Sequence, residues 1–239
     1  MVAIHEKALP LPGPTIQAQK EHGCTWLLET LQNTKEKITI IPVGPMTNLG
    51  MVLRMDPTVA DKIEEVVLMG GGVYIKNTTK CAEINFYNDP EAAKILLTSG
   101  IPITIVPLDA THSSWFGYPE AKKMMELGNP AAKFAGEMLK HRIDTALELG
   151  VRKEPMSALH DVLAVCAAID KSVLEELSLC SCDVDVSGGV ADGQLVVDTR
   201  PVAEYKYPTY VALKGNTEKL FQMLYSHLQN YGKASQQKR

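Results

Sequence analysis

The chain lacks the features that mark membrane-spanning, secreted and nucleic-acid-binding proteins. None of its apolar runs approaches the ~20 residues that a membrane-spanning helix needs, and its first residues contain no hydrophobic signal core. Its 239 residues carry a net charge of −4 with both signs interspersed, whereas phosphate backbones are bound by clustered lysine and arginine. The sequence therefore predicts a cytoplasmic protein that binds neither membranes nor nucleic acid.

Paired metal-binding and redox motifs are also lacking. The five cysteines include no Cys-x-x-Cys pair, which argues against a disulfide framework and a zinc site. Cys180 and Cys182 lie in an alternating run, where a strand places both thiols on one face, and we expect that face to be packed. Asp183 and Asp185 resemble a metal-binding pair, but their alternation with valines favours strand carboxylates that face solvent.

Glycine motifs for nucleotide phosphates are absent. The run Gly70-Gly71-Gly72 would need a further glycine at position 75, which is Ile75, to complete G-x-G-x-x-G, and no G-x-x-x-x-G-K-[ST] occurs. We expect these glycines instead to let the backbone approach another group closely.

Apolar runs that alternate with helical patterns predict the fold class. Residues 38–43, 66–69 and 101–108 are continuous apolar segments, typical of strands buried on both faces of a parallel sheet. Two further strands, 179–187 and 194–198, are predicted to form a hairpin, and 209–213 to form one more strand. Helices are predicted at 15–33, 47–55, 89–97, 119–149 with a break at 128–130, 156–169 and 216–228. We expect an open, mostly parallel Rossmann-like α/β sheet flanked by helices, with a C-terminal β-hairpin, forming one domain over residues 1–239.

Polar side chains gather after the predicted strands, where open parallel sheets bind ligands. Glu83 and Asn85 would share a face in an extended chain and offer acceptors and donors to hydroxyl groups. His160 could donate a proton, and Asp161 could hold a cation or a ribose hydroxyl. From composition alone, a solvated loop around Glu83 and a structural pair at 160–161 are the simpler explanations.

Taken together, the motifs resemble those of the inosine-uridine preferring nucleoside hydrolases, which are metal-dependent ribonucleoside N-glycosidases. In the family's order they are PVGPMTN at 42–48, VVLMGGG at 66–72, AEIN at 82–85, NDPEAA at 88–93, LDATH at 108–112 and HD at 160–161. The resemblance implies hydrolysis of purine or pyrimidine ribonucleosides to free base and ribose, as in nucleoside salvage, without a nucleotide cofactor. It also implies assembly into a homodimer or homotetramer.

The resemblance assigns the substrate-binding side chains. Asn77, Glu83 and Asn85 match the family's ribose-binding residues, and Met69 matches an apolar contact to the sugar. Such groups suit the chemistry, because glycosidic cleavage passes through an oxocarbenium-like sugar that must be held in place.

The resemblance also assigns the catalytic and metal-binding groups. His160 matches a histidine that assists departure of a purine base by donating a proton. Asp161 matches a calcium ligand that also contacts a ribose hydroxyl, and the main-chain carbonyl of Val43 matches a second ligand. The family's D-x-D-x-x-x-D-D motif, which supplies most of the calcium ligands, is absent from this chain. We therefore expect a family member truncated at its N-terminus, either a nucleoside hydrolase or a non-catalytic protein with a defective calcium site.

Overall fold

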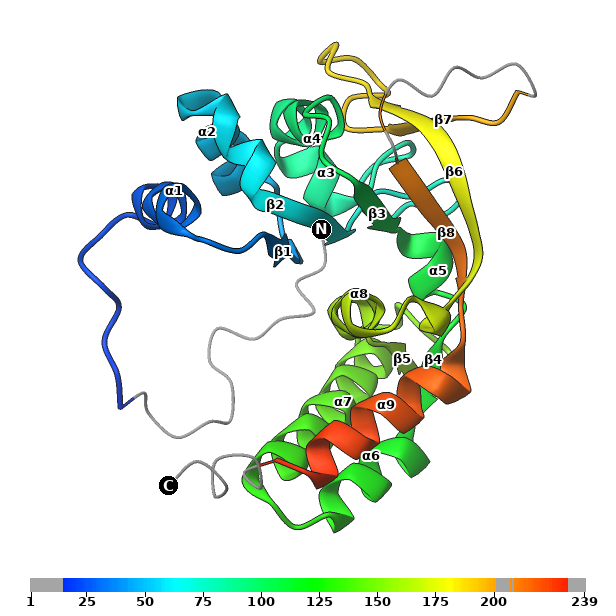
Figure 1. The fold of residues 1–239 in the computed structure, drawn as a ribbon. Helices are drawn as coiled ribbons and strands as arrows, with labels where there is room; N and C mark the ends of the chain where they lie inside the picture. The colour runs from blue at the N-terminus through cyan, green and yellow to red at the C-terminus, as the bar shows by residue number, and fades with distance from the viewer. Residues whose placement is uncertain (1–14, 201–206, 208, 232–239) are drawn as a thin grey trace.

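A six-stranded mixed sheet organises the computed structural model, which describes residues 15–200, 207 and 209–231 (Figure 1). The strand order is β1-β2-β3-β8-β6-β7. The parallel strands are β1 (Ile38–Ile40), β2 (Ile63–Met69), β3 (Ile103–Val106) and β8 (Thr209–Gly215). The antiparallel strands are β6 (Leu174–Val184) and β7 (Leu195–Asp198). The predicted mostly parallel sheet with a hairpin is confirmed, and the hairpin extends this sheet through β6.

Helices cover both faces of the parallel strands, because successive residues of a buried strand point to opposite sides. In β2, Val66 and Leu68 belong to one buried cluster, whereas Val67 and Met69 belong to the other. The first cluster lies under α1 (Gly23–Asn33), α2 (Thr47–Met55) and α4 (Pro90–Leu97). The second lies under α5 (Leu108–Thr111), α6 (Tyr118–Glu126), α7 (Pro130–Glu148), α8 (His160–Ile169) and α9 (Thr217–Gln229). Figure 1 shows these two groups of helices on opposite sides of β2 and β3.

Short elements connect this framework. They are the helix α3 (Ile84–Asn88), the 3-10 helices η1 (Pro57–Lys62) and η2 (Lys171–Val173), and the two-stranded sheet of β4 (Trp115–Gly117) and β5 (Met156–Ala158). Several predicted boundaries are confirmed by cap geometry. Asp89 accepts a hydrogen bond from the Ala92 amide at the start of α4, and Asn216 accepts one from the Lys219 amide at the start of α9. The predicted break at 128–130 separates α6 from α7.

Three predicted elements are longer than the structure allows. The first helix begins at Gly23 and not at residue 15, because the His22 side chain caps it by accepting from the Cys24 amide. The strand predicted to reach Val43 ends at Ile40, shortly before Pro42, which has no N–H to donate. The strand predicted over 101–108 spans Ile103–Val106, and Leu108 already belongs to α5.

The helix predicted over residues 156–169 is wrong at its start. Residues Met156–Ala158 form β5, which pairs antiparallel with β4 so that Ser157 lies opposite Phe116. The helix begins only at His160. This correction places His160 and Asp161 in the first turn of α8, where the positive end of the helix dipole favours an acidic side chain.

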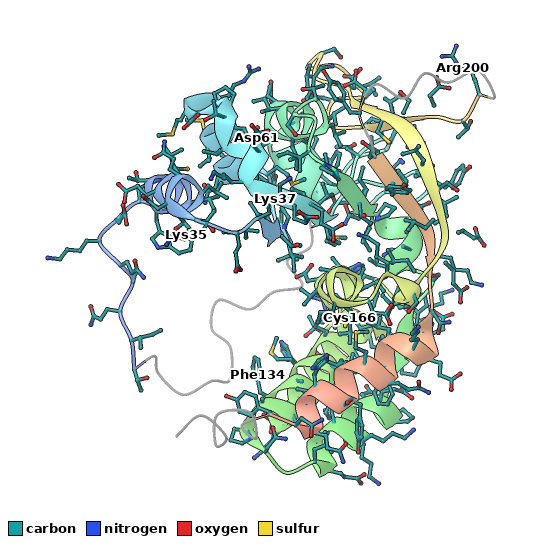
Figure 2. All side chains as sticks on the ribbon, in the orientation of Figure 1. Lys35, Lys37, Asp61, Phe134, Cys166 and Arg200 are labelled. Atoms are coloured by element: carbon teal, nitrogen blue, oxygen red, sulfur yellow. The ribbon has the colours of Figure 1, made fainter. Side chains whose placement is uncertain are left out.

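All five cysteines lie among the described residues, and their thiols are free there. Cys166 lies on α8 and is buried (Figure 2), and Cys180 and Cys182 pack against the first cluster. Asp183 is exposed and forms an ion pair with Lys94, as expected of a solvent-facing strand carboxylate. Across the described part of the chain, no helix is both long and apolar enough to cross a membrane.

Candidate active site

The carboxyl end of β2 is the centre of the candidate site. Gly71 has a φ of +70°, in the left-handed region that favours glycine. Its amide donates to Oε2 of Glu83 at 2.8 Å, and its carbonyl accepts from the Leu108 amide at 3.1 Å. One residue, Gly71, thus links the segment that carries Glu83 to the start of α5. The predicted close approach of the glycines is confirmed, since a Cβ on Gly71 would lie 2.9 Å from Leu195 Cδ2.

Glu83 is almost completely buried, at 1% exposure, and one of its carboxylate oxygens lacks a partner. Oε2 accepts from the amides of Gly71, Asn85 and Phe86 at 2.8, 2.9 and 3.3 Å. Oε1 is buried without a hydrogen bond. Because burial raises the pKa of Glu83, an added hydroxyl donor at Oε1 would both satisfy this oxygen and favour the ionised carboxylate.

Asn85 and Asn77 are held near Glu83 by separate hydrogen bonds. Asn85 Nδ2 donates to the Met69 carbonyl at 3.0 Å and contacts Met69 Sδ at 3.4 Å. Asn77 Oδ1 accepts from the Ile84 amide at 3.0 Å, which leaves its own amide group at an exposed position. The four predicted substrate-binding residues therefore lie on one connected segment that runs from the end of β2 into α3.

His160 is connected to this segment through α5. Its Nδ1 lies 2.7 Å from Oγ1 of Thr111, a buried residue in the same short helix as Leu108. Its ring also lies 5.4 Å, centroid to centroid, from the tilted ring of His112. Since the Leu108 amide binds the Gly71 carbonyl, a continuous path of contacts connects His160 to Glu83.

The surroundings of His160 hold its imidazole uncharged. Burial, followed by the positive charges of His112, Arg142 and Arg152, lowers the pKa of His160 to about 3. Burial and the charge of Arg152 also lower the pKa of His112. Arg152 itself stacks on Trp115, with Cζ 3.3 Å from the ring centroid. Near neutral pH the His160 ring therefore carries a proton on one nitrogen only.

The predicted calcium ligands do not by themselves form a calcium site. Asp161 and Val43 are both exposed. The charge of Asp161 acts to raise the pKa of Arg142, but burial of the guanidinium has the larger effect and lowers that pKa. Val43 follows Pro42, whose carbonyl accepts from the Met69 amide at 2.9 Å, so it adjoins the carboxyl end of β2. No group of three or more His, Cys, Asp or Glu side chains that could hold a metal occurs among the residues described. Two oxygen donors fall short of the six to eight that calcium takes.

The sequence did not single out Thr111 and did not identify the groups that contact Gly71. Thr111 and Gly71 both stand within the quoted motifs, but nothing in the motifs says that Thr111 contacts a histidine 49 positions away. The run of three glycines signals close backbone approach without identifying the partner. Both assignments require the tertiary structure.

Known proteins resemble this chain in sequence and in fold. The model of the inosine-uridine preferring nucleoside hydrolase family matches residues 4–222. The pyrimidine-specific ribonucleoside hydrolase RihB of Escherichia coli is 31% identical over 211 residues, which are 87% of this chain and 66% of that protein. RihB of Shigella flexneri is also 31% identical, over 85% of this chain and 64% of its own. The chain thus spans slightly less than two thirds of the length of these relatives.

Solved structures of similar proteins share the fold. A purine-preferring ribonucleoside hydrolase from Gardnerella vaginalis superposes with a TM-score of 0.82 at 27% identity, covering 93% of this chain and 70% of that one. An inosine-uridine preferring nucleoside hydrolase from Bacillus anthracis gives a TM-score of 0.72 at 22% identity, covering 88% of this chain and 66% of that one, and supports the fold alone.

Members of the matched family are generally metal-dependent. With the family model matching nearly the whole chain, this protein belongs to the inosine-uridine preferring nucleoside hydrolase family.

Proposed function

We propose that this chain hydrolyses the N-glycosidic bond of inosine- and uridine-type ribonucleosides, releasing free base and ribose. The observation that carries the proposal is the unpartnered, buried Oε1 of Glu83. A buried carboxylate oxygen without a donor is unfavourable, and a ribose hydroxyl is a donor of the right kind. The names of the relatives support the same reaction class.

Besides Asp161, four residues would hold the ribose. Glu83 would accept from a sugar hydroxyl through Oε1, and the exposed amide of Asn77 would bind a second hydroxyl. Met69 and Asn85 are joined by two contacts, so the apolar surface and the polar group for the sugar would be fixed together. Holding the ring in one geometry favours the planar, oxocarbenium-like transition state.

His160 would assist the leaving base. A neutral imidazole still carries one N–H, which can donate to a ring nitrogen of a departing purine. The Thr111 hydroxyl has two acceptors within reach, the Leu108 carbonyl at 3.3 Å and Nδ1 of His160 at 2.7 Å. Donation to the nearer Nδ1 would place the imidazole proton on Nε2. Thr111 would then act as a positioning residue that orients His160.

We propose calcium as the metal ion that the family requires, with Asp161 and the Val43 carbonyl as two of its ligands. These two donors do not complete a calcium shell. Asp161, in the first turn of α8, would bind a ribose hydroxyl directly.

The test is incubation of the pure chain with inosine or uridine in the presence of calcium. Free base, measured by chromatography, and reducing sugar should appear in equal amounts. Glu83→Gln should lower the rate at least tenfold, because the glutamine amide nitrogen, a donor, would replace the Oε1 acceptor that faces the ribose hydroxyl. Glu126→Gln is the matched control, because the same change falls on an exposed helical side chain. Absence of hydrolysis of both nucleosides in the parent chain would contradict the proposal.

A non-catalytic role is the second candidate. It is favoured by the lack of a cluster of metal-binding side chains in the described residues, and it predicts ribose binding without turnover in the same experiment. For the remaining properties, we propose a cytoplasmic location and a homodimer or homotetramer, which light scattering coupled to gel filtration would detect.

A further inference from the structure

Asp109 stands out as a buried carboxylate that faces backbone rather than solvent or substrate. It is 7% exposed in the first turn of α5, directly after β3. Its Oδ2 accepts from the Val73 amide at 2.7 Å, and its Oδ1 accepts from the amides of Tyr74 and Ile75 at 2.8 and 3.3 Å. One side chain thus binds three consecutive amides of the loop that follows β2.

The loop is closed on itself by Lys76. The Lys76 ammonium donates to the Val73 carbonyl at 2.9 Å and also to the Gly72 carbonyl. It interacts electrostatically with Asp109, although burial lowers the pKa of Lys76. Gly72 has no room for a side chain, because a Cβ there would meet the Ile75 carbonyl oxygen at 1.9 Å. Residues 72–76 therefore form a compact loop, which the Lys76 side chain closes and which Asp109 attaches to α5.

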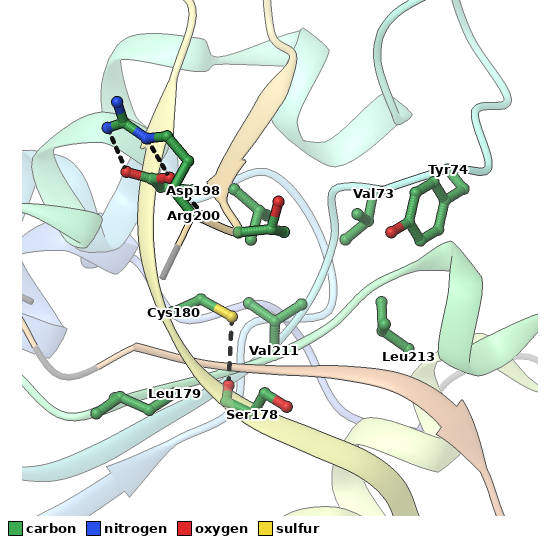
Figure 3. Close-up of a pocket in the computed structure, with 11 residues that line it drawn as sticks. Val73, Tyr74, Ser178, Leu179, Cys180, Asp198, Arg200, Val211 and Leu213 are labelled. Carbon is green, nitrogen blue, oxygen red and sulfur yellow. Dashed lines mark hydrogen bonds and ion pairs between the residues drawn. The ribbon is translucent and has the colours of Figure 1, made fainter. Parts of the chain in front are cut away.

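A cavity borders one side of this loop. Tyr74 is 75% exposed, and both Val73 and Tyr74 border a cavity of about 270 Å³. Figure 3 shows the two side chains across this opening from Val211 and Leu213 of β8. Val73 and Ile75 pack against the first and second buried clusters. The hydrogen bonds to Asp109 add a polar anchor to this packing, beside a cavity that leaves the loop room to shift.

The position of this loop matters because Asn77 is the next residue along the chain. Asn77 is exposed, and its own anchor is the bond from the Ile84 amide to Oδ1. That hydrogen bond joins Asn77 to the neighbour of Glu83, so a shift of residues 73–75 would pull on it and change the position of Asn77 relative to Glu83.

We propose that Asp109 is a positioning residue for substrate binding: by holding the amides of residues 73–75, it places Asn77 against the ribose. This inference rests on the proposed function. Because Asn77 would contact the ribose in both the ground state and the transition state, loss of its placement weakens binding without slowing the bound substrate.

The test compares Asp109→Asn with Asp183→Asn, which makes the same change at an exposed ion pair. An asparagine turns its amide nitrogen toward at least one of the three N–H groups. Hydrogen exchange at residues 73–75 should become at least tenfold faster in Asp109→Asn only. The KM for inosine should rise at least tenfold, with kcat changed less than threefold. Unchanged exchange, or faster exchange with an unchanged KM, would overturn the proposal.

Lys76→Met provides a second, milder variant if Asp109→Asn unfolds. It keeps the stem and removes the bonds to two loop carbonyls, so exchange and KM should rise together by a smaller factor; a rise in exchange alone would count against the proposal. If the parent chain has no turnover, the dissociation constant for D-ribose replaces KM in the same comparison. A parent that neither hydrolyses nucleosides nor binds D-ribose refutes the proposed function, whereas the exchange rates still decide whether Asp109 holds the loop.

Discussion

Replacing Gly71 with alanine should destabilise the chain through two separable effects. The first is backbone strain, because a φ of +70° costs an L-residue about 1–2 kcal/mol. The second is overpacking, because the new Cβ would lie 2.9 Å from Cδ2 and 3.2 Å from Cβ of the buried Leu195. Crowding of this kind costs about 1–3 kcal/mol. The free energy of unfolding should therefore fall by about 2–5 kcal/mol.

Gly100→Ala is the matched control for Gly71→Ala. Gly100 also has a positive φ, +85°, but a Cβ there meets nothing within 4 Å. Only the backbone effect of about 1–2 kcal/mol should remain. The difference between the two variants, measured by urea unfolding with unchanged m-values, isolates the overpacking.

A double-mutant cycle with Leu195→Ala tests the cause directly. Removing the Leu195 side chain beyond Cβ relieves the closest contact, so the double variant should lose about 1–3 kcal/mol less than the sum of the single losses. Equal destabilisation by Gly71→Ala and Gly100→Ala, or an additive cycle, would refute the reasoning. Because Gly71 binds both Glu83 and Leu108, the variant should also hydrolyse inosine more slowly.

The remaining predictions concern the groups of the site. His160→Ala should slow inosine cleavage at least tenfold yet spare a riboside with a p-nitrophenyl leaving group, and equal losses on both substrates would exclude assistance to the base. Burial raises the pKa of Glu83 in the folded chain. The folded state therefore binds this proton more tightly than the unfolded state does, and the free energy of unfolding should fall as the pH rises through the raised pKa. Glu83→Gln should remove this loss; identical pH dependence of unfolding in parent and variant would contradict it. Calorimetric titration should detect no tight calcium binding without nucleoside, and tight, stoichiometric binding would show that the metal site is complete.

Much of the fold could be predicted because its signals are local. Continuous apolar runs identify β2 and β3 as buried parallel strands. Asp89 and Asn216 identify helix starts, because a short polar side chain satisfies amides within its own turn. The prediction failed at residues 156–158, where pairing with β4 overrides a pattern that also fits a helix.

The sequence by itself determined the fold class and, through motifs in the family's order, the residues to inspect: Asn77, Glu83, Asn85 and the pair at 160–161. Only the tertiary structure decided how they are connected. The bonds from Glu83 to Gly71, from Thr111 to His160 and from Asp109 to the loop at 73–75 span 12, 49 and about 35 positions. Such contacts leave no periodic or local signal, because they depend on which strand ends the sheet brings together.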